Sequence, residues 1–250
     1  MAAEGRTLRV AALYPDLMSI YADRGNLLML ERRCAWRRIG FELRRIGIGD
    51  DLDPGAADLL YIGGGQDRDQ RLVALDLAER KRDAIHASVA RGAVLLAVCG
   101  GYQLLGRSYD LGADTLPGVD LVDLRTVRSE GPRLIGNVAI EVDLDGEGPR
   151  VLAGFENHGG RTFLGAGERP LGRVLRGHGN NGRDGFEGVW RGSVLGTYLH
   201  GPLLPKNAWL ADWLIARALG VERAALAPLD DSLEDAAHAE ARAAAGVTGV

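Results

Sequence analysis

Short apolar runs alternate with helical patterns over the first hundred residues, and this alternation limits the folds that the chain can adopt. Strands are predicted at four apolar runs, over residues 8–14, 41–48, 59–62 and 94–98. Amphipathic helical spacing occupies two of the intervening segments, 27–38 and 67–90. Strands separated by helices form right-handed βαβ crossovers, which place the strands side by side in a parallel sheet.

From about Thr126 the pattern changes to short β-rich segments between glycine-rich turns. These segments predict antiparallel strands and hairpins added to the sheet, at residues 134–142, 162–164, 172–175 and 186–199. A helix is predicted over 205–219. The Ala- and acid-rich segment 232–245 predicts a frayed or disordered end. We therefore expect one domain over 1–222 and a flexible tail over 223–250.

The composition excludes several classes of protein. The chain has 250 residues, a formal net charge of −4 and a pI near 5.8, so it lacks the basic surface that nucleic-acid binding needs. Its two cysteines, Cys34 and Cys99, fit a reducing cytosol better than a disulfide framework. The first residues lack an apolar signal segment, and no apolar run is long enough to span a bilayer. We expect a cytoplasmic protein without a membrane span.

Cys99 ends the apolar run 93–98 and is followed at once by two glycines. This pattern is typical of a nucleophile elbow, a tight turn from strand to helix that exposes one side chain. Ala97 and Gly101, two residues before and after the thiol, let strand and helix pass closely. The helix start places N–H groups beside the sulfur, which favours thiolate. A nucleophile is favoured over a buried structural cysteine, the usual role of a lone cysteine in an apolar run.

A thiol that attacks a carbonyl carbon needs a base. The chain has five histidines: His86, His158, His178, His200 and His238. His200 ends a β-rich run and precedes a flexible Gly-Pro turn, so it can reach the end of a neighbouring strand. The alternative is a loop histidine without a partner. The Asn157-His158 pair is interpreted as structural, or as a contact near a partner, rather than as a second base.

The segment Gly63-Gly64-Gly65 follows a predicted buried strand and opens a helix. It is not followed by the Gly-Lys-Ser/Thr of a phosphate loop, and it lacks the spacing of a dinucleotide fingerprint. It is either a simple turn or, beside Cys99, a source of backbone N–H groups for an oxyanion.

Three motifs together resemble the triad-type (class I) glutamine amidotransferases, most closely their cobyric acid synthase-like branch. The motifs are Cys99-Gly-Gly-Tyr-Gln, Gly63-Gly-Gly-Gln-Asp and Gly196-Thr-Tyr-Leu-His200-Gly. Within this branch, Phe155-Glu-Asn-His-Gly-Gly-Arg161 and the stand-alone length are similar to the GatD glutaminase subunits of lipid II isoglutaminyl synthases. The resemblance covers roughly residues 7–220 and implies a flavodoxin-like three-layer α/β fold, mostly parallel with antiparallel additions.

The resemblance also assigns roles to individual residues. It implies a nucleophile and a base, oxyanion donors, and two groups that hold the glutamine substrate. These are Cys99 and His200, the N–H groups of Gly64 or Gly65 and of Gly100, and the side chains of Gln103 and Arg133. Arg133 would bind the substrate carboxylate through a charge-assisted pair, and its alternative is a surface arginine.

One position departs from the family pattern. Members of the family carry an acid two residues after the histidine, and Pro202 stands at that position here. The third member of the triad is therefore absent from its usual place. Three alternatives follow: Cys99 and His200 act as a dyad, a backbone group orients His200, or an acid from elsewhere in the chain or from a partner does so.

The implied reaction is hydrolysis of glutamine to glutamate and ammonia through a Cys99 thioester. The implied partner is a Mur-ligase-like synthetase, MurT, in a heterodimer that amidates the D-glutamate of lipid II. No metal or cofactor is expected in this chain, because no Walker motif occurs in it and ATP and Mg²⁺ are expected on the partner. The alternatives are an amidase of a cobalamin-pathway synthase, a catalytically silent regulatory module, and a cysteine peptidase or thiol hydrolase.

Overall fold

In the computed structural model, which describes residues 3–20 and 23–248, a six-stranded sheet forms the centre of the molecule. The first two residues of the expected domain and the last two of the expected tail lie outside these ranges. The strands are β1 (Thr7–Leu13), β2 (Gly40–Ile46), β3 (Leu59–Ile62), β4 (Val94–Val98), β13 (Val189–Arg191) and β14 (Val194–Thr197). Their order is β13-β14-β4-β3-β1-β2, and every neighbouring pair is parallel except β13 with β14.

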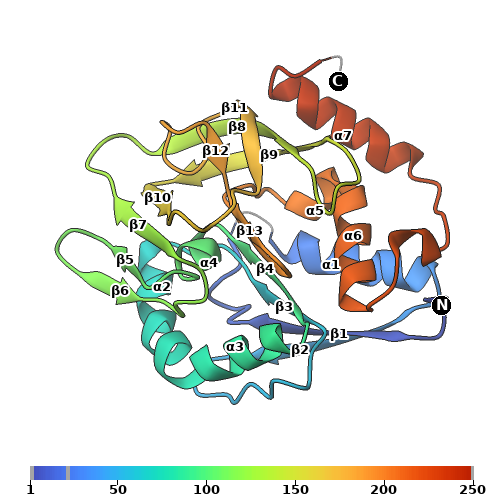
Figure 1. The fold of residues 1–250 in the computed structure, drawn as a ribbon, viewed down its shortest axis with the longest axis horizontal. Coiled ribbons are helices and arrows are strands. Elements are labelled where there is room, and N and C mark those ends of the chain that lie inside the picture. Colours follow the sequence, from blue (N-terminus) through green and yellow to red (C-terminus); the bar gives the residue numbers. More distant parts are fainter. Residues whose placement is uncertain (1–2, 21–22, 249–250) are drawn as a thin grey trace.

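Helices cover both faces of this sheet, as right-handed crossovers require when the strand order reverses at β1. Figure 1 shows α2 and α3 on one side of the sheet and α1 and α6 on the other. The helices are α1 (Arg24–Trp36), α2 (Asp67–Leu75), a π-helix (Asp76–Lys81), α3 (Arg82–Ala90), α4 (Gly100–Gln103), α5 (Leu203–Lys206), α6 (Ala208–Ala218) and a 3₁₀ turn (Arg223–Ala225). The predicted three-layer α/β fold is confirmed.

The antiparallel strands predicted as additions to the central sheet mostly form two separate four-stranded sheets, whereas β13 joins the central sheet as an antiparallel strand. One has the order β10-β7-β5-β6 and the other β12-β11-β8-β9. Their strands are β5 (Ser108–Asp110), β6 (Thr115–Pro117), β7 (Leu124–Arg128), β8 (Leu134–Val142), β9 (Arg150–His158), β10 (Gly160–Leu164), β11 (Gly172–Arg176) and β12 (Phe186–Glu187). Strands β5, β6, β7 and β9 were not predicted, and the β-rich run over 186–199 is three short strands.

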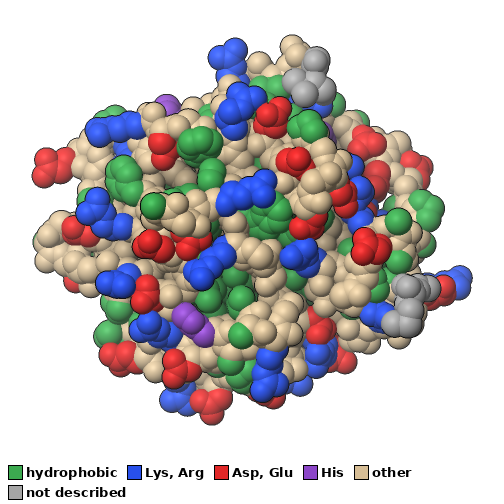
Figure 2. All heavy atoms as spheres, viewed as in Figure 1, with side chains coloured by type: hydrophobic (Ala, Val, Ile, Leu, Met, Phe, Trp, Pro, Cys, Tyr) green, Lys and Arg blue, Asp and Glu red, His purple; other side chains and the backbone are tan. Residues whose placement is uncertain are grey.

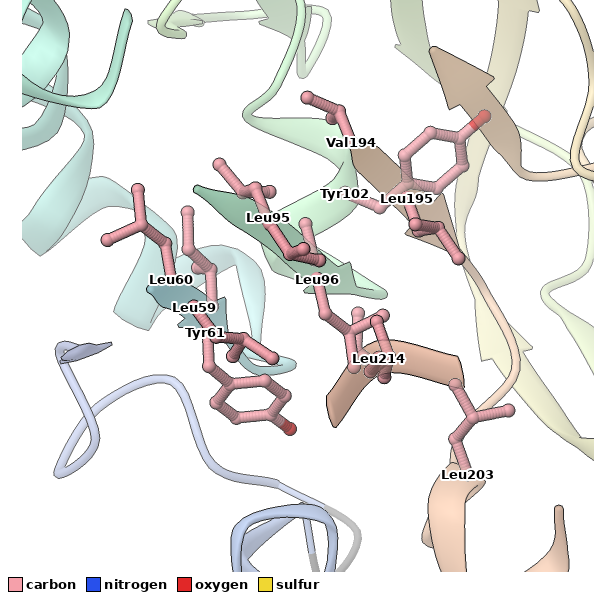
Figure 3. Packing of buried hydrophobic residues seen from close by; sticks show 14 of the residues in the cluster. Leu59, Leu60, Tyr61, Leu95, Leu96, Tyr102, Val194, Leu195, Leu203 and Leu214 are labelled. Atoms are coloured by element: carbon pink, nitrogen blue, oxygen red, sulfur yellow. The ribbon is translucent and has the colours of Figure 1, made fainter. Parts of the chain in front are cut away.

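The core lies on both faces of β3 and β4, whose residues are all buried. Figure 3 shows Leu95 and Leu96 of β4 between the side chains of β3 and those of β14 and α6. Tyr102, on the short helix after Cys99, lies beside Leu195 in the same view. The Tyr102 ring occupies the space that a Cβ on Gly196 would need, so only glycine fits there. The helix after Cys99 is thereby packed directly on β14.

The segment 232–245, expected to be frayed or disordered, instead contains the helix α7 (Ser232–Ala244). His238 Nδ1 donates a hydrogen bond to Lys206 O (2.8 Å), and Asn137 Nδ2 donates one to Ala244 O (3.0 Å). An Ala-rich, charged sequence favours helix as well as disorder, and these tertiary contacts select the helix. The expectation was wrong because none of those partners can be identified from the segment itself.

The surface carries charges of both signs. On the face seen in Figure 2, acidic and basic side chains are interspersed. Within residues 3–20 and 23–248, no helix has the length and apolar character needed to cross a membrane.

Candidate active site

The backbone makes a sharp turn at Cys99, between the last residue of β4 and the first residue of α4. Cys99 has φ 50° and ψ −104°, a conformation that L-residues other than glycine rarely adopt. Its N–H donates to Thr197 O on β14 (2.7 Å), which anchors the turn to the neighbouring strand. Strain of this kind persists only where the surroundings enforce it, and it is common at functional positions. The predicted elbow is therefore present in the structure.

Two glycines after Cys99 allow the close contacts that the turn needs. A Cβ on Gly100 would lie 2.7 Å from Gly65 N, and a Cβ on Gly101 would lie 2.7 Å from Ile62 O. These are backbone atoms that cannot easily move aside. The elbow consequently lies against the Gly63–Gly65 loop that follows β3.

Either of two N–H groups in this glycine loop, that of Gly64 or that of Gly65, was expected to face an oxyanion. The structure distinguishes between them. Gly64 N–H donates to Asp23 Oδ2 (2.5 Å). Gly65 lines the cavity beside Cys99. The N–H of Gly100 bonds to the Cys99 sulfur and lowers the pKa of that thiol. The structure therefore favours the N–H groups of Gly65 and Gly100 as oxyanion donors over that of Gly64.

A cavity of about 260 Å³ opens next to Cys99, a size suited to a small polar molecule. Three residues that were expected to contact the substrate or its oxyanion line this cavity together with Cys99: Gly65, Gln103 and Arg133. The lining residues are Ile20, Gly65, Gln66, Asp67, Arg68, Gln70, Cys99, Gln103, Arg133, Asn157, His158 and Gly159. No group of three His, Cys, Asp or Glu side chains within the described ranges has the arrangement of a metal site.

Arg133 forms part of the cavity wall although its side chain is exposed. Its Nε donates to Asn157 Oδ1 (2.8 Å) and its Nη2 donates to Asn157 O (2.7 Å). These two bonds hold the planar guanidinium in one orientation at the cavity. A guanidinium fixed at the cavity is suited to binding a carboxylate. An arginine with only a surface role would not need this fixed orientation.

Gln103 is buried, and both ends of its side-chain amide form hydrogen bonds. Gln70 Nε2 donates to Gln103 Oε1 (2.9 Å) and to Gly65 O (3.1 Å), while Gln103 Nε2 donates to Tyr198 Oη (3.2 Å). Gln103 therefore connects the glycine loop to the segment that leads to His200. This bridging role was not expected from the sequence.

His200 lies two residues beyond Tyr198, near the end of the strand that pairs with β4. In the register of these parallel strands Thr197 is opposite Val98, so the segment after β14 leads away beside Cys99. The backbone of His200 exchanges two hydrogen bonds with Phe155, of 3.0 and 3.1 Å. Its side chain is fully buried, and burial lowers its pKa to about 4. An imidazole in this environment is neutral near pH 7, as a base must be.

The imidazole that lines the cavity is that of His158 rather than that of His200, among the residues that the structure describes. His158 Nδ1 donates to Gly160 O (2.8 Å), and its ring is stacked on Tyr198 with the centroids 3.5 Å apart. Its Nε2 lies 3.6 Å from Glu156 Oε2. Glu156 is fully buried and was missed by sequence reasoning, because its backbone donors, the N–H groups of His178 and Gly179, come from a distant loop.

The thiol of Cys99 is not in a thiolate-favouring environment. Burial, with a smaller contribution from the Asp23 charge, raises the pKa of Cys99 to about 12, against the opposing effects of Arg133 and the Gly100 N–H. The expectation that the helix start lowers the pKa of the Cys99 thiol was wrong. A helix of four residues does not offset the removal of the sulfur from water.

Comparisons with known proteins identify the family of the chain and agree with its three-layer fold. Residues 9–208 match the CobB/CobQ-like glutamine amidotransferase domain. The chain belongs to this family.

Two relatives are subunits named GatD of lipid II isoglutaminyl synthase (glutamine-hydrolyzing). The one from Streptococcus pneumoniae is 38% identical over 214 residues, which is 85% of this chain and 80% of the relative. The one from Staphylococcus aureus is 39% identical over 204 residues, which is 81% of each. A cobyric acid synthase from Pelotomaculum thermopropionicum is 34% identical over 215 residues, but only 38% of its length is covered.

Two solved structures share the fold. The structure of PurLQS from Thermotoga maritima contains a chain that matches with a TM-score of 0.57 at 21% identity, covering 85% of this chain and 95% of that one. A crystal structure of a glutamine amidotransferase matches with a TM-score of 0.54 at 16% identity, covering 84% of this chain and 99% of that one.

Proposed function

We propose that this chain is the glutaminase subunit of a lipid II isoglutaminyl synthase. The observation that carries the proposal is the cavity in which a strained Cys99, the Gly65 N–H and the anchored Arg133 meet, in a chain similar to two GatD subunits over most of their length. The cobyric acid synthase relative is covered over 38% of its length, which supports the GatD assignment over a cobalamin-pathway amidase.

In the proposed reaction, Arg133 binds the α-carboxylate of glutamine and places the side-chain amide beside Cys99. The sulfur attacks the amide carbon while His200 accepts the thiol proton. The oxyanion that forms is stabilised by the N–H groups of Gly65 and Gly100. His200 returns the proton to the leaving nitrogen, so ammonia departs and a glutamyl thioester remains. Water then attacks the thioester with His200 as base, which releases glutamate and restores the thiol.

The resting groups of this site are both uncharged near neutral pH. Burial keeps the pKa of Cys99 at about 12 and that of His200 at about 4, so proton transfer from thiol to imidazole is uphill in the isolated chain. Pro202 occupies the position of the acid that would stabilise the imidazolium. We therefore propose that the isolated chain is a slow glutaminase and that its partner accelerates it. The partner would supply an acidic side chain to His200 or order the loop around Gly201.

In the same proposal the partner is a MurT-like, Mur-ligase-type synthetase. It binds ATP and Mg²⁺, activates the D-glutamate carboxyl of lipid II, and receives ammonia from this chain in a heterodimer. A silent regulatory module would need no strained nucleophile turn. A cysteine peptidase or thiol hydrolase would have little use for an arginine anchored at the end of a small cavity.

The test measures glutamate release by the chain alone, with a MurT-like synthetase, and with a cobyrinate-binding synthetase. We expect slow turnover alone and severalfold faster turnover with the MurT-like partner only. Changing acidic interface residues of that partner to amides is expected to remove the acceleration. Full turnover by the isolated chain would contradict the activation in trans, and acceleration by the cobyrinate-binding synthetase would contradict the GatD assignment.

A further inference from the structure

Asp23 is a buried carboxylate that the proposed reaction does not use. It is fully buried and occupies the position before the first residue of α1, where an aspartate ordinarily accepts a hydrogen bond from the N–H groups of its own helix. Its side chain makes no such bond. Oδ2 instead accepts the Gly64 N–H (2.5 Å), and the buried Oδ1 has no hydrogen-bond partner within the described part of the chain. Burial raises the pKa of Asp23 to about 7, against the opposing effect of the Gly64 N–H, so the ionised carboxylate is costly in this position.

The segment that contains Ile20 and Asp23 forms hydrogen bonds with both the C=O and the N–H of Gly64. Ile20 N–H donates to Gly64 O (3.1 Å), while Asp23 takes the Gly64 N–H. The described chain has no cis peptide bond, so the Gly65 N–H points opposite to Gly64 O, away from Ile20. The two contacts together define the orientation of the peptide groups before and after Gly64.

The nucleophile turn lies against the backbone of Gly65. A Cβ on Gly100 would lie 2.7 Å from Gly65 N, and a Cβ on Gly64 would lie 2.9 Å from Asp23 Oδ2 and 3.4 Å from Cys99 Cβ. Asp23, the glycine loop and Cys99 are thus in successive contact. Rotation of the Gly64–Gly65 peptide group would turn the Gly65 N–H away from the position where the oxyanion forms.

We propose that Asp23 is a positioning residue for the oxyanion loop: it fixes the Gly63–Gly64 peptide group by accepting the Gly64 N–H, while Ile20 N–H holds Gly64 O, and the two bonds together keep the Gly65 N–H directed at the oxyanion. This inference rests on the proposed glutaminase reaction at Cys99. It gives Asp23 two opposed effects. Its hydrogen bond positions an oxyanion donor, whereas its negative charge raises the pKa of the nearby thiol.

Two substitutions separate these effects. Asp23→Asn keeps an oxygen that can accept the Gly64 N–H and removes the charge, while Asp23→Ala removes both. Asp16→Ala is the matched control, because Asp16 is exposed and pairs with Arg45 at the surface. All variants are made in a Cys34→Ala background, so that Cys99 is the single thiol of the full chain.

The first measurement is inhibition by the γ-aldehyde of glutamate, which forms a tetrahedral adduct with a thiol and places its oxygen in the oxyanion site. We expect Asp23→Ala to weaken inhibition at least about tenfold, with a smaller change in KM for glutamine, because a misplaced oxyanion donor affects tetrahedral species most. Asp23→Asn should lose less than Asp23→Ala. Equal losses in both variants, or none in Asp23→Ala, would overturn the proposal.

The second measurement is the pH dependence of Cys99 alkylation by iodoacetamide, which needs no glutaminase activity. Other charges that act on Cys99 come from Asp67 and Arg133, and these stay unchanged. Asp23→Asn should lower the pKa of Cys99 by removing the charge while it keeps most of the aldehyde inhibition. A loss of inhibition of about tenfold or more in Asp23→Asn would overturn the proposal even if Asp23→Ala failed to fold. If the unsubstituted Asp23 chain formed no aldehyde adduct while its Cys99 was still alkylated, the proposed function, and not the placement of Asp23, would be at fault.

Discussion

Arg133 shows how one residue combines an exposed side chain with a fixed orientation. Its two hydrogen bonds to Asn157 hold the guanidinium at the cavity. Arg133→Ala should raise KM for glutamine much more than it lowers kcat, because a carboxylate clamp binds the ground state and the transition state alike. Steady-state kinetics with Arg173→Ala as control, an exposed arginine paired with Glu141, measures this split. An unchanged KM would show that Arg133 is a surface residue without a role in binding.

The two histidines near Cys99 differ in their setting. His200 is beyond the end of the strand paired with β4, whereas His158 is held by Gly160 O and stacked on Tyr198. His200→Ala should abolish covalent labelling by a glutamine-analogue electrophile, and His158→Ala should retain part of it, because only His200 is proposed to accept the thiol proton. Labelling rates near neutral pH provide the comparison. Equal rates in both variants would contradict the choice of base.

At the scale of elements, α1 and α6 are joined by buried charges. Asp212 accepts two hydrogen bonds from Arg33, of 2.5 and 2.7 Å, and two from Arg37, of 2.8 and 2.7 Å. The Arg33 side chain is fully buried and also pairs with Asp231, at the start of α7. Removing the Asp212 charge leaves two buried guanidinium groups without the carboxylate that they share.

Asp212→Asn should therefore lower the free energy of unfolding by about 3–5 kcal/mol. Asp231→Asn should cost clearly less, because Arg33 keeps Asp212 and the Asp231 carboxylate is 30% exposed. Urea unfolding at constant m-value measures both. A loss below about 1 kcal/mol for Asp212→Asn would mean that packing, not this ion pair, joins the two helices.

Sequence patterns predicted the elements whose residues are uniformly apolar and missed those defined by partners elsewhere. β3 and β4 are buried over their whole length, and their apolar runs identified them. β9 was missed because its second half contains buried polar residues such as Glu156, whose burial depends on donors from the loop at His178 and Gly179.

The same distinction applies to the site. The Cys99 turn was predictable from adjacent residues, because the strand, the thiol and the glycines are contiguous in sequence. The bond from Gly64 N–H to Asp23 spans 41 positions and was not predictable. The raised pKa of Cys99 also escaped prediction, because it arises from burial by the assembled fold.

At the scale of the whole molecule, the fold brings separate segments to one end of the sheet. The loop after β3, the turn after β4 and the segment after β14 meet at the carboxyl ends of parallel strands, where open α/β sheets bind their ligands. The antiparallel additions supply Arg133, Asn157 and His158 to the opposite wall of the cavity. The central claim is that glutamine hydrolysis at this junction passes through a thioester on Cys99.

The most direct test is acid quenching of the chain during glutamine turnover, followed by peptide mass spectrometry. The account predicts a glutamyl adduct on the peptide that contains Cys99, retained in Cys34→Ala and absent from Cys99→Ser, with glutaminase activity lost only in Cys99→Ser. Undiminished turnover by Cys99→Ser, or an adduct on any other residue, would contradict it.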